Sequence, residues 1–406
     1  MVDSASLPLP PGEGWGEGSK PPTLVVAALS ARTLAESAAQ AGWRVIALDL
    51  FGDLDTRRAS ARWVSIGEPG VLAIDARRLR AALNDAAHEP GVIGWVAGSG
   101  FEGALTLLDA GPASLPRLGM ASAAVRDLRD PRHFFATLDR LGLARPSTRF
   151  NAPVDTKGWL VKRAGGTGGW HIRDASGTRH RHADSYFQRR QEGVPMSALF
   201  LADGRGARWV ALNQLTVRAL GAHPCVYRGA IGPIDDTDLQ SKLEAALALL
   251  VPAFGLRGLA SLDFIAADGV PQLLEINPRP SASMALHANA WPGGLMRAHV
   301  EAAQGRLPAI PAAHLPGLRG TEILYARHAG SLGTALAGQL AAATDCHDLP
   351  TANTQFAPAD PVCSISAQGS DVAAVQRALA ERRAGILARL DPATTDPETT
   401  MQGYAP

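Results

Sequence analysis

Blocks of apolar residues separated by polar turns predict a parallel βαβ unit near the start of the chain. The run Thr23–Leu29 is short, apolar and rich in β-branched residues, which is typical of a buried strand. We expect Ser30 to cap a helix over Ala31–Ala41, followed by a strand over Arg44–Leu50 and a further strand over Gly91–Ala97. The first 120 residues or so are therefore predicted to be Rossmann-like, but no GxGxxG motif follows the first strand, so a dinucleotide is not indicated.

The middle of the chain combines helices with antiparallel strands. Asp130 and Pro131 are typical of a helix start, and the pair Asp268-Gly269 indicates a tight hairpin turn. The elements expected here are the strands Trp159–Val161, Met196–Ala202 and Trp209–Leu212, the amphipathic helix Thr237–Leu250, and the hairpin strands Gly258–Ala267 and Gln272–Ile276.

The pattern changes again after residue 305, where three prolines predict a linker before short strands and a last helix. These features are Pro308, Pro311, Pro316, the strands Thr321–Tyr325 and Pro361–Ile365, and the helix Asp371–Leu390. The predicted segments are a disordered leader (1–22), a Rossmann-like domain (23–120), a second domain (121–305, with a small lid over 150–195), a β-rich cap (306–390) and a loose tail (391–406).

Composition narrows the range of functions. The 406 residues include 39 Lys and Arg against 38 Asp and Glu, so the charge is too balanced for non-specific nucleic-acid binding. The three cysteines, which are never in a CxxC pair, exclude a disulfide framework and a thiolate zinc site. The leader lacks the features of a signal peptide, and Leu243–Leu256 is too short to cross a membrane. We therefore expect a cytoplasmic protein that acts on small molecules.

A glycine-rich segment is the first candidate for chemistry. Lys162 ends a predicted strand and is followed by Gly165-Gly166-Thr167-Gly168-Gly169. Backbone N–H groups in such a turn can surround an anion, and a lysine beside it supplies a point charge for a phosphate oxygen. The chain has only four lysines, which adds weight to this one. The alternative is a surface loop without a ligand.

A second candidate lies on the predicted hairpin. Glu275 and Asn277 alternate on one strand and share a face, and Asp263 on the partner strand can face Glu275. Two carboxylates and an amide oxygen are ligands that suit Mg²⁺, while Arg279 beside them could stabilise a phosphoryl group or an acyl oxyanion. The alternative is an ordinary polar row on an edge hairpin.

With these motifs in order, residues 23–300 resemble the ATP-grasp superfamily. The resemblance implies an α/β fold, α+β in the ATP-binding part, with a Rossmann-like pre-ATP-grasp domain and a β-rich C-terminal cap. It implies ATP with Mg²⁺ or Mn²⁺, phosphate binding by Lys162 and its loop, metal binding by Asp263, Glu275 and Asn277, and a catalytic Arg279. It places the adenine-binding hinge at Gln188–Gly193, with Gln188, Arg190 and Gln191 as contacts. Pro131 replaces a nucleotide-binding lysine, for which Arg129 or Arg132 could substitute.

More narrowly, four segments are similar to predicted carboxylate–amine ligases associated with methanofuran (methylofuran) and tetrahydromethanopterin synthesis, a group related to tyramine–glutamate ligase. The segments are SARTLAESAAQAGWRVIALDLFGDLDTR, GSGFE, KRAGGTGGWHI and EINPRPSASM. This resemblance implies amide formation through an acyl phosphate, with glutamate as the first candidate acid and Arg218 or Arg228 as its partner. It is also compatible with a homodimer.

Two other functions stay open at this point. The first is a carboxylase similar to biotin carboxylase, although no lysine follows Lys242, so the cap cannot itself carry biotin. The second is an ATP-binding regulator without catalysis. It is favoured by Gln188, which replaces the acidic residue usual at the hinge of the family, and by Pro131. It is disfavoured by the complete set of Asp263, Glu275, Asn277 and Arg279.

Overall fold

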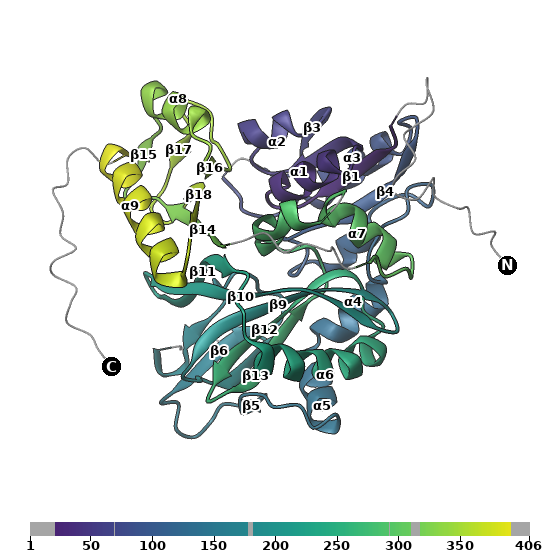
Figure 1. The fold of residues 1–406 in the computed structure, drawn as a ribbon, viewed down its shortest axis with the longest axis vertical. Coiled ribbons are helices and arrows are strands. Elements are labelled where there is room, and N and C mark those ends of the chain that lie inside the picture. Colours follow the sequence, from purple (N-terminus) through teal and green to yellow (C-terminus); the bar gives the residue numbers. More distant parts are fainter. Residues whose placement is uncertain (1–20, 69, 178–181, 292, 310–316, 391–406) are drawn as a thin grey trace.

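In the computed structural model, an N-terminal domain, a small four-stranded sheet and a C-terminal part are arranged around a central eight-stranded sheet (Figure 1). The described residues are 21–68, 70–177, 182–291, 293–309 and 317–390. The predicted tail, the predicted leader up to residue 20, and two of the linker prolines, Pro311 and Pro316, lie outside these ranges. Within them, no helix has both the length and the apolar character needed to cross a bilayer.

The N-terminal domain is built on a parallel four-stranded sheet in the order β3-β2-β1-β4. Its elements are β1 (Thr23–Ala27), α1 (Arg32–Gln40), β2 (Arg44–Asp49), α2 (Leu54–Arg58), β3 (Arg62–Ser65), α3 (Ala76–Ala86), β4 (Val92–Ala97), η1 (Leu105–Asp109) and α4 (Ser122–Arg129). The parallel pairing of β1 with β2 confirms the predicted βαβ unit.

The predicted cap of the first helix is wrong. Ala31 precedes α1 and no side chain caps it. The Ala31 N–H instead donates to Asp49 Oδ2 at the end of β2 (3.0 Å), and the Ser30 hydroxyl donates to Asp348 Oδ1 (3.3 Å). A carboxylate from the neighbouring strand therefore takes over the role expected of Ser30.

Two larger antiparallel sheets, and a two-stranded one that pairs Gly330–Ser331 with Gln355–Phe356, contain the remaining strands of the described chain. The small lid sheet has the order β5-β8-β6-β7, and the central sheet has eight strands in the order β13-β12-β9-β10-β11-β14-β18-β16. The elements of this region are α5 (Pro131–Arg140), β5 (Thr148–Arg149), β6 (Trp159–Arg163), β7 (Arg173–Asp174), η2 (Ala175–Gly177), β8 (Ser185–Arg189), β9 (Val194–Asp203), β10 (Ala207–Leu220), β11 (His223–Gly232), α6 (Thr237–Phe254), β12 (Arg257–Ala267), β13 (Val270–Asn277), η3 (Ala282–Ala290) and α7 (Gly294–Ala303).

The predicted helix start and hairpin are both confirmed. The Asp130 side chain accepts a hydrogen bond from the backbone of α5, with Pro131 in the first turn. Strands β12 and β13 pair in antiparallel fashion around Asp268 and Gly269, whose φ angles are 48° and 72°. Positive φ at both positions is what a two-residue hairpin turn requires.

The C-terminal strands extend the central sheet. β14 pairs with β11, and β18 pairs with both β14 and β16. The elements are β14 (Leu318–Tyr325), β15 (Gly330–Ser331), α8 (Thr334–Ala342), β16 (Cys346–His347), β17 (Gln355–Phe356), β18 (Pro361–Gly369) and α9 (Val372–Leu390). Helix α9 packs on β14 and β18 through a shared apolar core, so the C-terminal part is continuous with the sheet that carries the hairpin.

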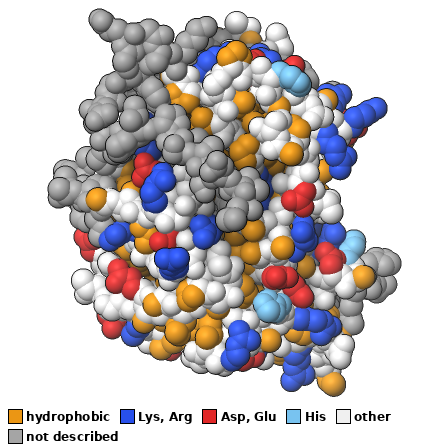
Figure 2. Space-filling view, turned by 90° about the vertical axis from the view of Figure 1, so that its right-hand side faces the viewer, with side chains coloured by type: hydrophobic (Ala, Val, Ile, Leu, Met, Phe, Trp, Pro, Cys, Tyr) orange, Lys and Arg blue, Asp and Glu red, His pale blue; other side chains and the backbone are white. Residues whose placement is uncertain are grey.

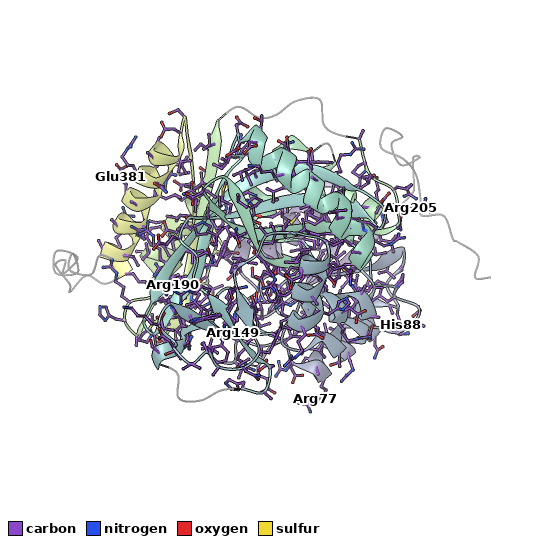
Figure 3. All side chains as sticks on the ribbon, turned by 90° about the horizontal axis from the view of Figure 1, so that it is seen from below. Arg77, His88, Arg149, Arg190, Arg205 and Glu381 are labelled. Atoms are coloured by element: carbon purple, nitrogen blue, oxygen red, sulfur yellow. The ribbon has the colours of Figure 1, made fainter. Side chains whose placement is uncertain are left out.

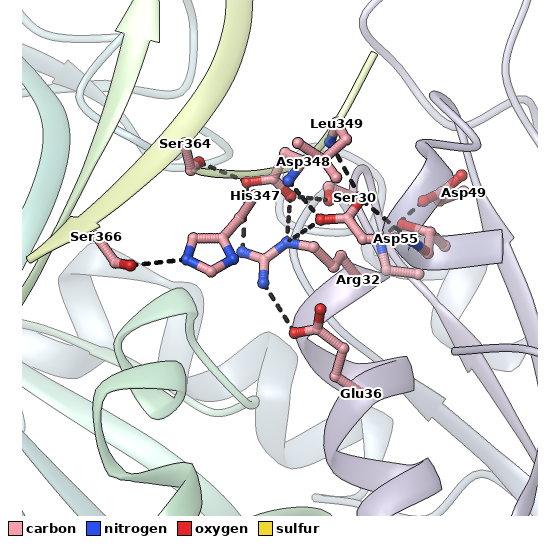
Figure 4. Close-up of polar contacts among 12 residues, drawn as sticks. Ser30, Arg32, Glu36, Asp49, Asp55, His347, Asp348, Leu349, Ser364 and Ser366 are labelled. Atoms are coloured by element: carbon pink, nitrogen blue, oxygen red, sulfur yellow. Dashed lines mark hydrogen bonds and ion pairs between the residues drawn. The ribbon is translucent and has the colours of Figure 1, made fainter. Parts of the chain in front are cut away.

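A partly buried ionic cluster joins the C-terminal part to the N-terminal domain (Figure 4). Arg32 on α1 donates from Nε to Asp348 Oδ1 (2.8 Å) and from Nη1 to Glu36 Oε2 (2.9 Å). The Asp55 carboxylate accepts the backbone N–H groups of Asp348 (2.7 Å) and Leu349 (3.1 Å). We call this cluster the Arg32 network, with the members Ser30, Arg32, Glu36, Asp55, Asp348, Leu349 and Ser364.

The surface shows no large field of one charge on the face drawn in Figure 2. Basic and acidic side chains are interspersed there among apolar and neutral ones. The distribution agrees with the near-zero net charge of the sequence.

Candidate active site

A cleft of about 1170 Å³ lies where the N-terminal domain, the lid, the central sheet and the C-terminal part meet. Most of the predicted site residues line it, although they come from separate elements. Those that do are Lys162, Gly166, Thr167, Gly168, Gly169, Gln188, Arg190, Gln191, Asp263, Glu275, Asn277 and Arg279. A fold in which distant segments converge on one large concave site is the usual setting for ligand binding.

Lys162 lies buried on β6, diagonally across from Gln188 on the neighbouring strand β8. Its ammonium donates to Gln188 Oε1 (2.6 Å), and the Gln188 amide in turn donates to Thr148 Oγ1 (3.3 Å). Burial lowers the pKa of Lys162, an effect that the nearby Glu275 partly offsets. A buried ammonium whose direct partner is a neutral amide would gain strongly from an anionic ligand.

The glycine-rich loop is held against the central sheet by backbone contacts. The Tyr227 N–H donates to the Gly168 carbonyl (3.0 Å). Gly168 and Gly169 have φ angles of 62° and 79°, and a Cβ atom on Gly169 would overlap the carbonyl oxygen of Cys225. Glycine is therefore required at position 169 both by backbone conformation and by close approach.

Asp263, Glu275 and Asn277 meet on the hairpin as the alternation predicts. Asp263 pairs with Glu275 across β12 and β13, and Asn277 Nδ2 donates to Asp263 Oδ2 (3.0 Å). Ser197 Oγ donates to the other oxygen of Asp263 (2.7 Å). Burial and the adjacent Glu275 raise the pKa of Asp263 to about 7. Two carboxylates this close repel each other unless a cation lies between them.

The oxygen-rich character of this group fits a hard divalent cation. Asn277 uses its amide nitrogen on Asp263, which leaves its oxygen for a ligand. Across the described ranges there is no cluster of three or more His, Cys, Asp or Glu residues suited to a metal, so a cation here would rely on the amide oxygen as well as the two carboxylates. Such mixed oxygen sets are characteristic of Mg²⁺ sites that are completed by phosphates and water.

Arg129 does not line the cleft but contacts a candidate metal ligand, and the sequence carried only an ambiguous signal for it. Its guanidinium donates to Glu275 Oε2 (3.1 Å) and to the carbonyls of Ala164 and Gly166 in the loop (both 2.9 Å). Arg132, the other candidate, lies over the ring of Phe150 instead, 4.2 Å from its centroid. Arg129 is thus the one of the two that links the phosphate loop to the candidate metal ligand.

Arg279 is paired with an acid from a different domain. Its Nε donates to Glu102 Oε1 (2.6 Å), in the loop after β4. The only sequence signal for Glu102 was its place in the GSGFE segment, which carried no assigned role.

His171 follows the glycine-rich loop and lines the cleft. Burial lowers its pKa to about 4, so its imidazole is neutral at physiological pH. Its Nδ1 atom is buried without a hydrogen-bond partner among the described residues. The ring packs where a Cβ atom on Gly166 would lie, which agrees with a loop-packing role.

Two predicted contacts differ from expectation. Arg218 and Arg228 do not line the cleft: Arg218 is exposed, and Arg228 lies over the ring of Tyr325, 5.5 Å from its centroid. Strand alternation explains this, because their neighbours Val217 and Tyr227 take the cleft-facing positions. Arg190, labelled on the lid in Figure 3, is exposed at the rim and pairs with Asp174 (3.1 Å).

Gly165 also lies outside the cleft lining, although its neighbours in the loop belong to it. It packs instead on the loop after β4, where a Cβ atom at position 165 would come within 3.2 Å of the Gly103 Cα. The loop that was predicted to bind phosphate therefore also contacts the N-terminal domain.

Comparisons with known proteins agree with this geometry. Residues 128–283 match the family model described as an ATP-grasp domain. No curated protein sequence matches the chain. Among solved structures, N5-carboxyaminoimidazole ribonucleotide synthetase from Thermus thermophilus has a TM-score of 0.63 at 16% identity, covering 92% of this chain and 99% of that one.

Two further structures extend the comparison. Biotin carboxylase from Campylobacter jejuni, in a β,γ-ATP complex, has a TM-score of 0.67 at 12% identity, covering 94% of this chain and 97% of that one. N5-carboxyaminoimidazole synthase from Aspergillus clavatus, with ADP and 5-aminoimidazole ribonucleotide, has a TM-score of 0.65 at 11% identity, covering 91% and 99%. Residues 128–283 are therefore similar to ATP-grasp domains, and the predicted fold class is confirmed.

Proposed function

We propose that the chain is an ATP-dependent carboxylate–amine ligase. An oxygen of the substrate carboxylate attacks the γ-phosphorus of ATP, and ADP leaves. The amine then attacks the acyl carbon, phosphate leaves, and the amine loses a proton to form the amide. The observation that supports this is the meeting of Lys162, the glycine-rich loop, the Asp263–Glu275 pair and Arg279 in one cleft.

Each group has a role that its surroundings support. Lys162 and the loop would hold the phosphates, since the hydrogen-bond partner of the buried ammonium among the described residues is a neutral amide. Asp263, Glu275 and Asn277 would hold Mg²⁺ or Mn²⁺, which when bound neutralises charge on the phosphates. Arg279 lines the same cleft and would orient the acyl phosphate and stabilise its developing charge.

Glutamate is the proposed acid, and one-carbon coenzyme synthesis the proposed setting. The support is the resemblance of the SARTLAESAAQAGWRVIALDLFGDLDTR, GSGFE, KRAGGTGGWHI and EINPRPSASM segments. Because Arg218 and Arg228 do not line the cleft, the carboxylate of glutamate that does not react requires a different partner.

The test is a screen of ADP release with Mg²⁺, candidate acids and candidate amines, beginning with isotope-labelled glutamate and tyramine. Incorporation of label into an amide supports the full proposal. ADP release with another acid replaces glutamate and keeps the ligase. ATP hydrolysis that depends on bicarbonate contradicts the ligase and favours a carboxylase, and ATP binding without turnover favours a regulator.

Assembly and location are proposed with it. One neighbour, the biotin carboxylase domain of 2-oxoglutarate carboxylase from Hydrogenobacter thermophilus, is described as a dimer. We expect a homodimer in the cytoplasm, and light scattering coupled to gel filtration measures the first of these.

A further inference from the structure

The loop after β4 brings a buried carboxylate into the candidate active site. The side chain of Glu102 is only 8% exposed. Its Oε1 accepts from Arg279 Nε (2.6 Å), and its Oε2 accepts from the Gly100 N–H (2.7 Å). Both carboxylate oxygens are therefore engaged, one by its own loop and one by the predicted catalytic arginine.

The backbone of this loop is fixed on two sides. Gly100 has a φ of 107°, and a side chain there would overlap Leu29 after β1. Gly103 packs against Gly165 at the start of the glycine-rich loop. Glu102 thus projects from a backbone held between the parallel sheet and the phosphate loop, which limits how far its carboxylate can move.

Charge explains why Glu102 stays ionised although it is buried. Burial alone would raise its pKa, but Arg279 and Arg129 lower the pKa below its usual value. Arg129 is itself paired with Glu275, so acidic and basic groups alternate from the candidate metal ligands to Arg279. Removing the Glu102 charge would leave two neighbouring guanidiniums without the anion between them.

The contact also determines which part of Arg279 is available. Nε is committed to Glu102, and Nη1 donates to the Pro280 carbonyl (3.3 Å). Nη2 makes no hydrogen bond to any described residue, while the side chain lines the cleft. An arginine held by Nε presents its terminal nitrogens in a fixed orientation, as recognition of a planar or tetrahedral anion requires.

We propose that Glu102 is a positioning residue for Arg279, through which the N-terminal domain controls the transfer step. This inference rests on the proposed ligase function. Glu102 contributes no proton and need not contact substrate. It holds the guanidinium so that the terminal nitrogens face the acyl phosphate, and a misplacement of about 1 Å at such a group can cost about 100-fold in rate.

The experiment compares Glu102→Gln with a matched control, Glu322→Gln. Glu322 is also a buried carboxylate in an ion pair (Arg383, 2.7 Å), but it does not line the cleft. We expect Glu102→Gln to lower kcat for ADP release about 10- to 100-fold with ATP affinity within about 2-fold, and Glu322→Gln to leave kcat unchanged. Equal losses in the two variants would overturn the proposal.

A double-mutant cycle asks whether Glu102 acts through Arg279. In an Arg279→Lys background, Glu102→Gln should lower kcat by less than about 2-fold, because the contact it supports is already lost. A full multiplicative loss would show that Glu102 acts independently of Arg279 and would overturn the positioning role.

A readout without turnover separates this inference from the proposed function. Hydrogen exchange of the Arg279 Nε–H, assigned by NMR from its loss in Arg279→Lys, should be slow in the wild type and in Glu322→Gln and fast in Glu102→Gln. Continued protection in Glu102→Gln contradicts the positioning role whatever the substrates are. Lost protection, together with the absence of ligase turnover in the wild type, supports the positioning contact and counts against the ligase.

Discussion

The Arg32 network and the candidate active site are both rich in charged residues, but they differ in how completely these charges are paired. In the network, Asp348 accepts from Arg32, Ser30 and Ser364, and Asp55 accepts two backbone N–H groups. In the cleft, Lys162 has an amide as its partner, and Asp263 lies beside another carboxylate.

The Arg32 network lines part of the same cleft through Ser30, Arg32, Asp348 and Ser364, so the difference distinguishes charges that join two parts of the fold from charges that are left open to a ligand. Buried charges that are fully hydrogen-bonded hold two parts of a fold in one arrangement, and any loss of a partner is costly. Charges left with incomplete pairing carry a cost that a ligand can offset, which is why perturbed pKa values gather at functional sites. The two regions should therefore respond to substitution in different assays.

The largest effect on free energy is expected for a substitution in the Arg32 network. Arg32→Ala should lower the free energy of unfolding by about 3–5 kcal/mol, because it leaves the largely buried Asp348 without its cation. Urea denaturation measures this, with ATP affinity of the folded variant as the companion measurement. A stable Arg32→Ala protein that has lost ATP binding would show that the Arg32 network serves ligand binding and not the joining of the two parts.

Glu275→Gln should lower the rate of catalysis and not the stability of the fold. We expect a loss of about 100-fold or more in Mg²⁺-dependent kcat, since neutralising phosphate charge is worth several kcal/mol, with a smaller change in ATP binding. Asn277→Ala should behave similarly. Steady-state ADP release at saturating Mg²⁺ is the measurement, and near-full activity in either variant contradicts the metal assignment.

Lys162→Ala should weaken ATP binding about 10- to 100-fold, because charge-assisted contacts contribute about 1.5–3 kcal/mol. Calorimetric titration with ATP measures it. Lys242→Ala is the matched control: this lysine is exposed on α6, paired with Asp238 (2.6 Å), and should leave ATP affinity unchanged. If both lysine variants bind ATP like the wild type, the role given to Lys162 is wrong.

The smallest effect concerns Asp53, which lines the cleft next to the network. Burial, with Asp348, Asp49 and Asp55 nearby, raises its pKa to about 8. The ionised form is thus disfavoured in the folded state, and wild-type stability should fall as pH rises from about 4, the usual value for Asp, through 8.

Asp53→Asn removes this penalty. The variant should be more stable than the wild type by about 1 kcal/mol at pH 8.5, with the difference shrinking toward pH 4. Thermal unfolding across this range measures it. A variant that is less stable than the wild type at pH 8.5 would show that the ionised Asp53 carboxylate stabilises the fold, as the paired carboxylates of the Arg32 network do.

The sequence by itself determined those elements whose cause lies within a few neighbouring residues. The apolar run of β1, the Asp130 cap with Pro131, and the Asp268-Gly269 turn all carry their cause within a few residues. Helix α3 was not predicted, although its buried residues Leu79, Ala82, Leu83 and Ala86 follow helical spacing and Asp75 caps it.

The sequence also determined the facing of Asp263, Glu275 and Asn277, because strand periodicity and a two-residue turn fix the register of a hairpin. Tertiary structure alone decided the partners that arrive from far along the chain. Glu102 reaches Arg279 across 177 positions, and Arg129 reaches Glu275 across 146. The tertiary structure also decided that Arg218 and Arg228 do not line the cleft. The periodicity of a strand or helix determines on which face of that element a side chain lies. Which elements that face contacts depends on how the separate elements pack together.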